Sequence, residues 1–201
     1  MKKETIEYRS IFCLEGEWNQ KDLRDKTSVN QLLIYMDESL GISSIFRKVN
    51  SKDSFFKYLE LLEKYWKGKF NSYGILYLAF HGESNCIWLD DNEKITLEEL
   101  STEAKDILKD RIIHFGSCST LRIQKEELTQ FFNNSGAKAV SGFSKEIPFL
   151  ESSVFDIAYL SKIAEYEHTG RIKTFIQSNL NGLSERLGFI YIDKNSISNG
   201  K

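Results

Sequence analysis

The sequence predicts an α/β domain with a mostly parallel β-sheet and helices on both of its faces. Short apolar runs alternate along the chain with amphipathic stretches, and this alternation is typical of such a sheet. The run at residues 75–80 is apolar throughout, as expected of a strand buried on both faces in the middle of a parallel sheet. A chain of 201 residues supports one hydrophobic core, so we expect a single domain over residues 1–201.

Periodicity and end signals justify each element in turn. Apolar residues recur at helical spacing in residues 28–40, and Ser51 is typical of the N-cap of the helix that follows it. Thr96 and Glu99 have the spacing of a capping box, which predicts that another helix opens there. In chain order, the predicted strands are residues 10–14, 44–49, 75–80, 86–89 (a short hairpin arm), 112–115, 138–142 and 188–192, and the remaining predicted helices are residues 125–133, 152–165 and 171–179.

The charge balance and the apolar runs exclude several classes of partner. With 27 basic and 29 acidic residues the formal net charge is -2, so no overall positive field would collect nucleic acid or an anionic membrane. No apolar run approaches the roughly 20 residues that span a bilayer, and the charged start of the chain lacks the apolar core of a signal peptide. We therefore expect a cytoplasmic protein with no nucleic-acid or membrane partner, in which Cys13, Cys86 and Cys118 are free thiols.

Two reactive side chains follow two strongly apolar predicted strands. His81 comes directly after residues 75–80, and Cys118 comes shortly after residues 112–115. The carboxyl ends of parallel strands gather at one edge of a sheet, where ligands bind, so pairing of these strands would bring imidazole and thiol into one crevice. A thiol with an ordinary pKa of about 8.5 becomes a competent nucleophile beside an imidazole. The sequence therefore predicts a catalytic pair, with Cys118 as the nucleophile and His81 as the general acid and base.

Small residues flank both members of this pair. Gly82 lets the chain turn directly after His81, and Gly116 and Ser117 keep the approach to the sulfur open. The backbone N–H groups of Gly82 and Cys118 are the candidate donors of an oxyanion hole.

At these residues the chain resembles caspase-like cysteine peptidases (clan CD). Residues 77–82 (Tyr-Leu-Ala-Phe-His-Gly) look like the histidine strand end of these enzymes, and residues 112–120 (Ile-Ile-His-Phe-Gly-Ser-Cys-Ser-Thr) look like their nucleophile strand end. Residues 136–143, followed by an apolar helix, are similar to the strand and helix after the nucleophile in CHAT domains, the branch related to separase. The likeness spans residues 10–161 in element order. The segment Phe-Cys-Leu-Glu-Gly-Glu-Trp at residues 12–18 also resembles an uncharacterised family of small bacterial proteins.

The resemblance implies a three-layer caspase-like (caspase-hemoglobinase) fold and a peptidase that needs no cofactor and no metal. It implies that His81 and Cys118 act as a dyad without an obligatory third member, on a protein or peptide substrate. The chain lacks the Gln-Ala-Cys-x-Gly surroundings of true caspases, so caspase-type aspartate specificity is not expected. An activating partner and a role in a bacterial defence or cell-death pathway are suggested only by analogy with other caspase-like proteins.

Specificity is expected from charged groups in two loops. By resemblance, clan CD peptidases bind the residue before the scissile bond with groups after the first strand and after the strand that follows the nucleophile. In this chain those places carry Glu15, Glu17, Glu146 and Glu151. Carboxylates there would favour Arg or Lys, so we expect cleavage after a basic residue.

Three alternatives stay open at this stage. The first is a catalytically silent interaction module of the same fold, and the second is a thiol-dependent acyl transferase or a redox sensor that uses Cys118 differently. Zinc is the third, because His81-x4-Cys86 and His114-x3-Cys118 have plausible ligand spacing. Against zinc, His114 is predicted to lie inside a strand and under a layer of helices.

Overall fold

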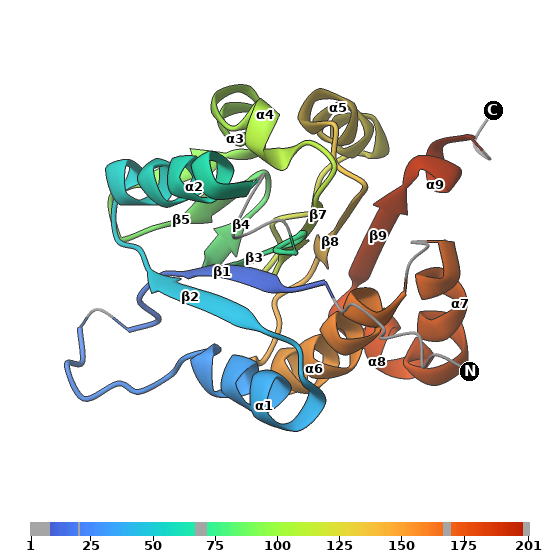
Figure 1. Ribbon diagram of the computed structural model, residues 1–201, viewed down its shortest axis with the longest axis horizontal. Coiled ribbons are helices and arrows are strands. Elements are labelled where there is room, and N and C mark those ends of the chain that lie inside the picture. Colours follow the sequence, from blue (N-terminus) through green and yellow to red (C-terminus); the bar gives the residue numbers. More distant parts are fainter. Residues whose placement is uncertain (1–8, 20, 67–71, 167–169, 199–201) are drawn as a thin grey trace.

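The computed structural model describes residues 9–19, 21–66, 72–166 and 170–198. Within this part of the chain, six strands form one sheet in the order β2-β1-β3-β7-β8-β9 (Figure 1). Neighbouring strands are parallel, except that β9 runs antiparallel to β8. The predicted, mostly parallel sheet is thus confirmed. The expectation about a signal peptide rests on the charged start of the chain, and residues 1–8 lie outside the described part. The strands are β1 (Ile11–Glu15), β2 (Ser44–Lys48), β3 (Ile75–Ala79), β7 (Ile112–Phe115), β8 (Ala139–Phe143) and β9 (Phe189–Asp193).

Helices cover both faces of this sheet, which makes three layers (Figure 1). Successive side chains of a strand point to opposite faces, so each strand contributes to two cores. Phe12 and Leu14 of β1 pack toward one group of helices, and Ile11 and Cys13 pack toward the other. The first group is α2 (Lys52–Trp66), α3 (Leu97–Glu103), α4 (Lys105–Leu108) and α5 (Lys125–Ser135), the second is α1 (Asn30–Leu40), α6 (Phe149–Glu165), α7 (Gly170–Asn179) and α8 (Asn181–Leu187), and α9 (Lys194–Ser198) follows β9.

A small antiparallel sheet follows directly after β3. It consists of β4 (His81–Glu83), β5 (Cys86–Trp88) and β6 (Lys94–Thr96), in that spatial order among the described residues. Hydrogen bonds fasten it to the segment after β7, among them one from the hydroxyl of Ser84 to the carbonyl of Arg122 over 2.6 Å. The N–H of Asn85 donates to the carbonyl of Thr120 over 3.1 Å, and the hydroxyl of Thr120 donates to the carbonyl of Cys86 over 3.2 Å. The segments after β3 and β7 are therefore joined to each other.

Most predicted elements are present, with differences at the short ones. Ser51 caps α2 by accepting the N–H of Ser54, and Thr96 caps α3 by accepting the N–H of Glu99, as predicted. Helix α6 begins at Phe149, earlier than expected. Neither β4 nor β6 was predicted, because a three-residue strand is too short to show alternation. In the described ranges, no helix is long and apolar enough to cross a bilayer.

Candidate active site

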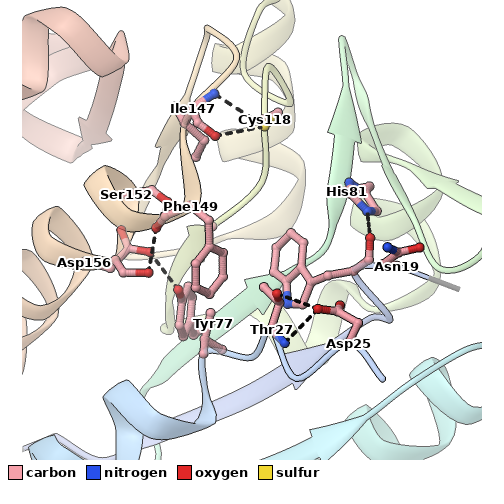
Figure 2. A pocket seen from close by; sticks show the side chains of 14 residues that line it. Asn19, Asp25, Thr27, Tyr77, His81, Cys118, Ile147, Phe149, Ser152 and Asp156 are labelled. Atoms are coloured by element: carbon pink, nitrogen blue, oxygen red, sulfur yellow. Dashed lines mark hydrogen bonds between the residues drawn. The ribbon is translucent and has the colours of Figure 1, made fainter. Parts of the chain in front are cut away.

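The two predicted catalytic residues line the same cavity. β3 and β7 are parallel neighbours in the sheet, so their carboxyl ends lie at one edge. His81 follows β3 and is exposed, and Cys118 lies in the turn after β7 and is half-buried. Both border a cavity of about 330 Å³ (Figure 2). Imidazole and thiol thus face one space at the edge where ligands of parallel sheets bind.

Gly82 brings the two segments into direct contact. A Cβ atom at this position would collide with the carbonyl oxygen of Cys118 and with the hydroxyl of Thr120. Only glycine therefore allows the backbone after His81 to lie against the backbone of Cys118. The separation of the two candidate catalytic residues depends on this contact.

The ring of His81 is oriented by a backbone carbonyl. Its Nε2 atom lies 2.8 Å from the carbonyl oxygen of Trp18. A carbonyl oxygen can only accept a hydrogen bond, so Nε2 is the protonated nitrogen of the neutral ring and Nδ1 is free to exchange a proton. The indole of Trp18 also packs edge-on against the imidazole, with ring centroids 5.3 Å apart.

The thiol of Cys118 contacts a different loop. Its Sγ atom accepts the N–H of Ile147 over 3.5 Å and lies 3.8 Å from the carbonyl oxygen of the same residue (Figure 2). In the described part of the chain no hydrogen bond joins Cys118 to His81. The thiol and the imidazole must therefore approach each other before they can exchange a proton.

The backbone around the thiol is tightly turned. Ser119, directly after Cys118, has φ 55, a left-handed conformation that non-glycine residues rarely adopt. Its N–H donates to the carbonyl of Lys145 over 2.9 Å, which ties the turn to the loop after β8. Among the described residues, the N–H of Cys118 makes no hydrogen bond to another backbone group. Strained backbone of this kind is common where a side chain must be presented to a ligand.

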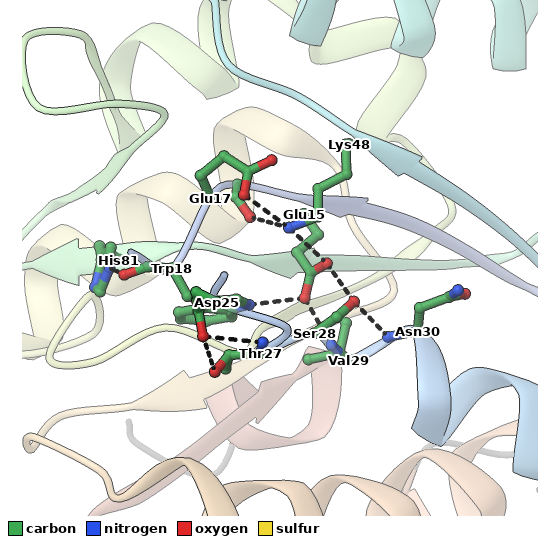
Figure 3. Close-up of polar contacts among 11 residues, drawn as sticks. Glu15, Glu17, Trp18, Asp25, Thr27, Ser28, Val29, Asn30, Lys48 and His81 are labelled. Atoms are coloured by element: carbon green, nitrogen blue, oxygen red, sulfur yellow. Dashed lines mark hydrogen bonds and ion pairs between the residues drawn. The ribbon is translucent and has the colours of Figure 1, made fainter. Parts of the chain in front are cut away.

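Glu15 is not at the surface of the cavity but beneath the loop that follows β1. Its carboxylate is fully buried and accepts hydrogen bonds from the indole of Trp18 (2.8 Å), the hydroxyl of Ser28 (2.7 Å) and the N–H of Val29 (2.6 Å) (Figure 3). Lys48 lies 3.3 Å from the same carboxylate. These contacts fix the loop that supplies the carbonyl of Trp18 to His81. The carboxylate of Glu15, which was expected to bind substrate, thus contacts this loop and Lys48 and does not line the cavity.

The other three glutamates also lie outside the cavity lining. Glu17 is exposed and pairs with Lys48 over 3.4 Å, and Glu151 pairs with Arg186 over 2.8 Å. Glu146 is exposed on the loop after β8. None of the three borders the cavity that His81 and Cys118 share, although Glu17 and His81 both line a second, neighbouring pocket.

Two aspartates line the cavity instead, and the sequence analysis missed both. Asp25 is exposed at the rim, where it accepts hydrogen bonds from the N–H and the hydroxyl of Thr27. Asp156, on α6, is only 2% exposed. One of its oxygens accepts the hydroxyl of Tyr77 over 2.7 Å, and the other lies 3.0 Å from Nε2 of His114. A signal for Asp156 was present in the sequence, because it is a charged residue on the largely apolar stripe formed by Phe155, Tyr159, Leu160 and Ile163.

His114 belongs to a buried polar network. Its Nδ1 lies 3.0 Å from the hydroxyl of Ser141, which also accepts a hydrogen bond from Tyr159 over 2.8 Å. Both ring nitrogens therefore have protein partners, and the side chain is fully buried under α6, as the sequence analysis expected. Burial and the neighbouring carboxylate of Asp156 raise the pKa of Tyr77 well above its usual value, so this phenol stays a hydrogen-bond donor.

The remaining thiols differ from Cys118 in their surroundings. Cys13 lies in the core between β1 and the helices, and burial raises its pKa well above the ordinary value. Burial also raises the pKa of Cys86 in β5. Since the thiolate is the nucleophile, these two cysteines are poorly suited to chemistry at neutral pH.

Comparisons with known proteins identify a family and agree with the fold. Residues 8–192 match a family described as a "Family of unknown function (DUF6642)". Among curated proteins, none matches the chain. A secreted C11 cysteine protease from Bacteroides thetaiotaomicron, solved with an irreversible peptide inhibitor, is similar in structure with TM-score 0.53 and 13% identity, over 89% of this chain and 59% of that protein. The chain thus spans well under two thirds of the length of this neighbour. Caspase-1 from Spodoptera frugiperda is similar with TM-score 0.52 and 12% identity, over 95% of this chain and 88% of that protein. These likenesses show the caspase-like α/β fold.

Proposed function

The chain belongs to the DUF6642 family, and we propose that it is a cysteine endopeptidase that uses His81 and Cys118 and cleaves after a basic residue. One observation carries the proposal. An exposed imidazole and a half-buried thiol line one cavity at the carboxyl ends of neighbouring strands, in a fold whose solved neighbours are cysteine proteases. The two carboxylates of this cavity, Asp25 and Asp156, support the basic specificity.

The proposed reaction proceeds through a thioester. Nδ1 of His81 takes the proton of the Cys118 thiol, and the thiolate attacks the carbonyl carbon of the substrate. The developing oxyanion is bound by backbone N–H groups, of which those of Cys118 and Gly82 are the candidates. His81 then gives its proton to the leaving nitrogen, and the C–N bond breaks. In the second half, His81 takes a proton from water, whose oxygen attacks the thioester carbon. The S–C bond breaks, and a carboxylic acid leaves as the thiol re-forms.

Trp18 and Glu15 have positioning roles in this proposal. The carbonyl of Trp18 accepts the Nε2 proton of His81, which directs Nδ1 toward proton transfer. The carboxylate of Glu15 in turn accepts the indole N–H of Trp18 and the N–H of Val29, which fixes the loop. Neither group has to touch the substrate.

The position of the thiol favours a second candidate function. Since Sγ of Cys118 contacts Ile147 and not His81, the fold would also suit a catalytically silent module that binds a peptide in the same cavity. Such a module would keep the cavity and its charge but would form no covalent product. Chemistry at Cys118 therefore distinguishes the two candidates.

A covalent probe tests the proposal directly. Peptidyl acyloxymethyl ketones with Arg or Lys next to the reactive group should add one mass label at Cys118, as measured by intact-mass and peptide mass spectrometry. Labelling should be absent in Cys118→Ala and strongly slowed in His81→Ala. The peptidase would be contradicted, and the binding module favoured, by the following combination of results. Iodoacetamide labels Cys118, no peptidyl probe does, and the chain cleaves no peptide of a positional library.

The assignment to the CHAT branch and the role in a bacterial defence or cell-death pathway are parts of the same proposal. The first rests on the resemblance of residues 77–82, 112–120 and 136–143, and the second rests only on analogy with other caspase-like proteins. Toxicity on expression that disappears in Cys118→Ala would support a cell-death role. Equal growth with and without an active site under every inducing condition would speak against it.

A further inference from the structure

The cavity beside Cys118 has a carboxylate at the end farthest from His81. Asp156 of α6 and Tyr77 of β3 line it there, and both residues are buried. In Figure 2 they lie across the cavity from His81. Gly116 lines the cavity beside them, and a Cβ on this residue would collide with the ring of Tyr77. The absence of a side chain at position 116 is what lets Tyr77 reach the carboxylate.

Asp156 keeps acceptor capacity that its protein partners do not use. Its Oδ2 accepts the hydroxyl of Tyr77 over 2.7 Å, and its Oδ1 lies 3.0 Å from His114. An ionised carboxylate offers about four acceptor sites, so each oxygen retains one for a further donor. Because the carboxylate lines the cavity, such a donor can only come from a molecule inside it.

The walls between the thiol and this carboxylate are largely apolar. Trp18 and Phe149 stand edge to face with ring centroids 5.6 Å apart, and Ile147 lies beside Cys118. The volume of about 330 Å³ is at the lower end of the range of ligand pockets, about 300–1,000 Å³. Such a shape fits one long side chain with an apolar stem and a polar end, as Arg and Lys have.

We propose that Asp156 is the specificity-determining residue of this cavity and that it binds the cationic end of an Arg or Lys side chain. That this side chain precedes the scissile bond rests on the proposed function. A buried carboxylate costs free energy that an arriving cation offsets, whereas a neutral side chain leaves it without a new partner. A guanidinium can donate to both oxygens at once and is the preferred ligand. Asp25, exposed at the rim, adds long-range attraction but no selection.

Binding to a chain without its nucleophile tests this assignment. In Cys118→Ala, a peptide ending in Arg should bind about 10- to 100-fold more tightly than the same peptide ending in citrulline, which has nearly the same shape and no charge. Adding Asp156→Asn should reduce this ratio to within about threefold and leave the affinity for the citrulline peptide nearly unchanged. The matched control is Glu151→Gln on the same helix, whose carboxylate pairs with Arg186 outside the cavity and whose loss should leave the ratio intact.

Isothermal titration calorimetry gives these ratios without any cleavage step. If the Arg peptide and the citrulline peptide bind equally well, or if Asp156→Asn keeps the full ratio, the assignment of Asp156 is overturned. Absence of cleavage by the unmodified chain would contradict the peptidase alone, because the calorimetric ratio does not depend on Cys118.

A measurement on the unmodified chain covers the case in which Asp156→Asn does not fold. Agmatine, a guanidinium on a four-carbon amine, should slow alkylation of Cys118 by iodoacetamide in a saturable way. N-butylurea, which has no charge, should not slow it at the same concentration. Equal protection by both compounds, or by neither, would overturn the proposal.

Discussion

His81 and His114 each lie near a side chain that can act as a nucleophile, but their surroundings are opposite. His114 is fully buried, with Ser141 at 3.0 Å on one ring nitrogen and Asp156 at 3.0 Å on the other, the order of a serine hydrolase triad. His81 is exposed, its Nε2 contacts a backbone carbonyl, and its Nδ1 faces a space shared with Cys118.

The difference shows why hydrogen bonds alone do not identify a catalytic group. In the His114 network every polar atom has a protein partner and no substrate can approach Ser141, which is fully buried. Such a network contributes to folding, since each buried polar group in it is satisfied. The His81 site leaves a nitrogen and a thiol with room for a reacting carbonyl. Substitutions of His81 or Cys118 should therefore affect activity, and substitutions of His114 or Ser141 should affect stability. Asp156 belongs to the buried network and also lines the cavity.

The largest effect on activity is expected at His81 and Cys118. Cys118→Ala and His81→Ala should each lower peptide cleavage at least about 1,000-fold, because the nucleophile or its proton carrier is missing. The free energy of unfolding in urea should change by less than about 1 kcal/mol, since both side chains lie at the edge of the sheet. The double variant should cleave peptides no more slowly than the less active of the two single variants. Near-normal cleavage by Cys118→Ala would show that the reaction does not take place at the pair of His81 and Cys118.

The next effect is on stability, at the buried network. His114→Ala removes a partner from Asp156 and from Ser141 and should lower the free energy of unfolding by about 2–4 kcal/mol. Ser141→Ala is the milder control and should cost about 1 kcal/mol, because Tyr159 and His114 each lose a single hydrogen bond. Urea titrations followed by circular dichroism measure both. If His114→Ala is as stable as the unmodified chain, the network does not stabilise the fold in the way its burial indicates.

A smaller effect is expected at the link between the loop and the catalytic ring. Glu15→Gln keeps the shape of the side chain but weakens its contacts with Trp18, Val29 and Lys48, at a cost of about 1–3 kcal/mol in unfolding free energy. Its specific readout is the tautomer of His81, measured by ¹⁵N chemical shifts of the ring. We expect a mixture of Nε2–H and Nδ1–H forms in Glu15→Gln and a single Nε2–H form in the control Glu17→Gln. An unchanged tautomer in Glu15→Gln would leave Glu15 with a structural role only.

The smallest effect concerns alkaline pH. Burial raises the pKa values of Tyr77 and Tyr159 well above their usual value in the folded chain, whereas in the unfolded chain both phenols ionise near pH 10. Ionisation then favours the unfolded state, so the stability that is fully present below about pH 10 decreases as the pH rises further. By pH 10.5 the loss should be about 1 kcal/mol per buried tyrosine. In Tyr159→Phe, unfolding curves between pH 9 and 10.5 should show about half of this slope.

The sequence allowed the exposed pair to be predicted but not the groups that surround it. His81 and Cys118 follow apolar strands directly, so their positions depend on local pattern and on one rule about parallel sheets. Trp18 reaches His81 only through the path of a loop that Glu15 fixes from below, and no local periodicity encodes that path. Asp156 depends on how α6 is rotated against the sheet. Its place on an apolar stripe was visible in the sequence, but the partner that explains it, Tyr77, is 79 positions away.

The same distinction applies to the fold as a whole. Long, periodic segments such as residues 52–66 and 75–79 were predicted because burial of one face or of both faces leaves a clear pattern. The antiparallel direction of β9 was not predicted, because a strand's residues do not encode the direction of its neighbour. The glutamates were expected at the cavity because they are near the strand ends in sequence. The side chains of Glu15, Glu17 and Glu151 instead contact Lys48, Arg186 or buried donors, and that of Glu146 is exposed.

The contact between Gly82 and the turn at Cys118 also makes the active site part of a cooperative unit. The small sheet β4-β5-β6 is fastened to that turn through Asn85, Cys86 and Thr120, so local opening of the sheet separates His81 from the thiol in the same event. A ligand that needs both groups in place then binds only the closed form and shifts the opening equilibrium by mass action. Amide exchange in residues 81–96 would thus report occupancy of the site from a distance, without any change in the average structure of the sheet.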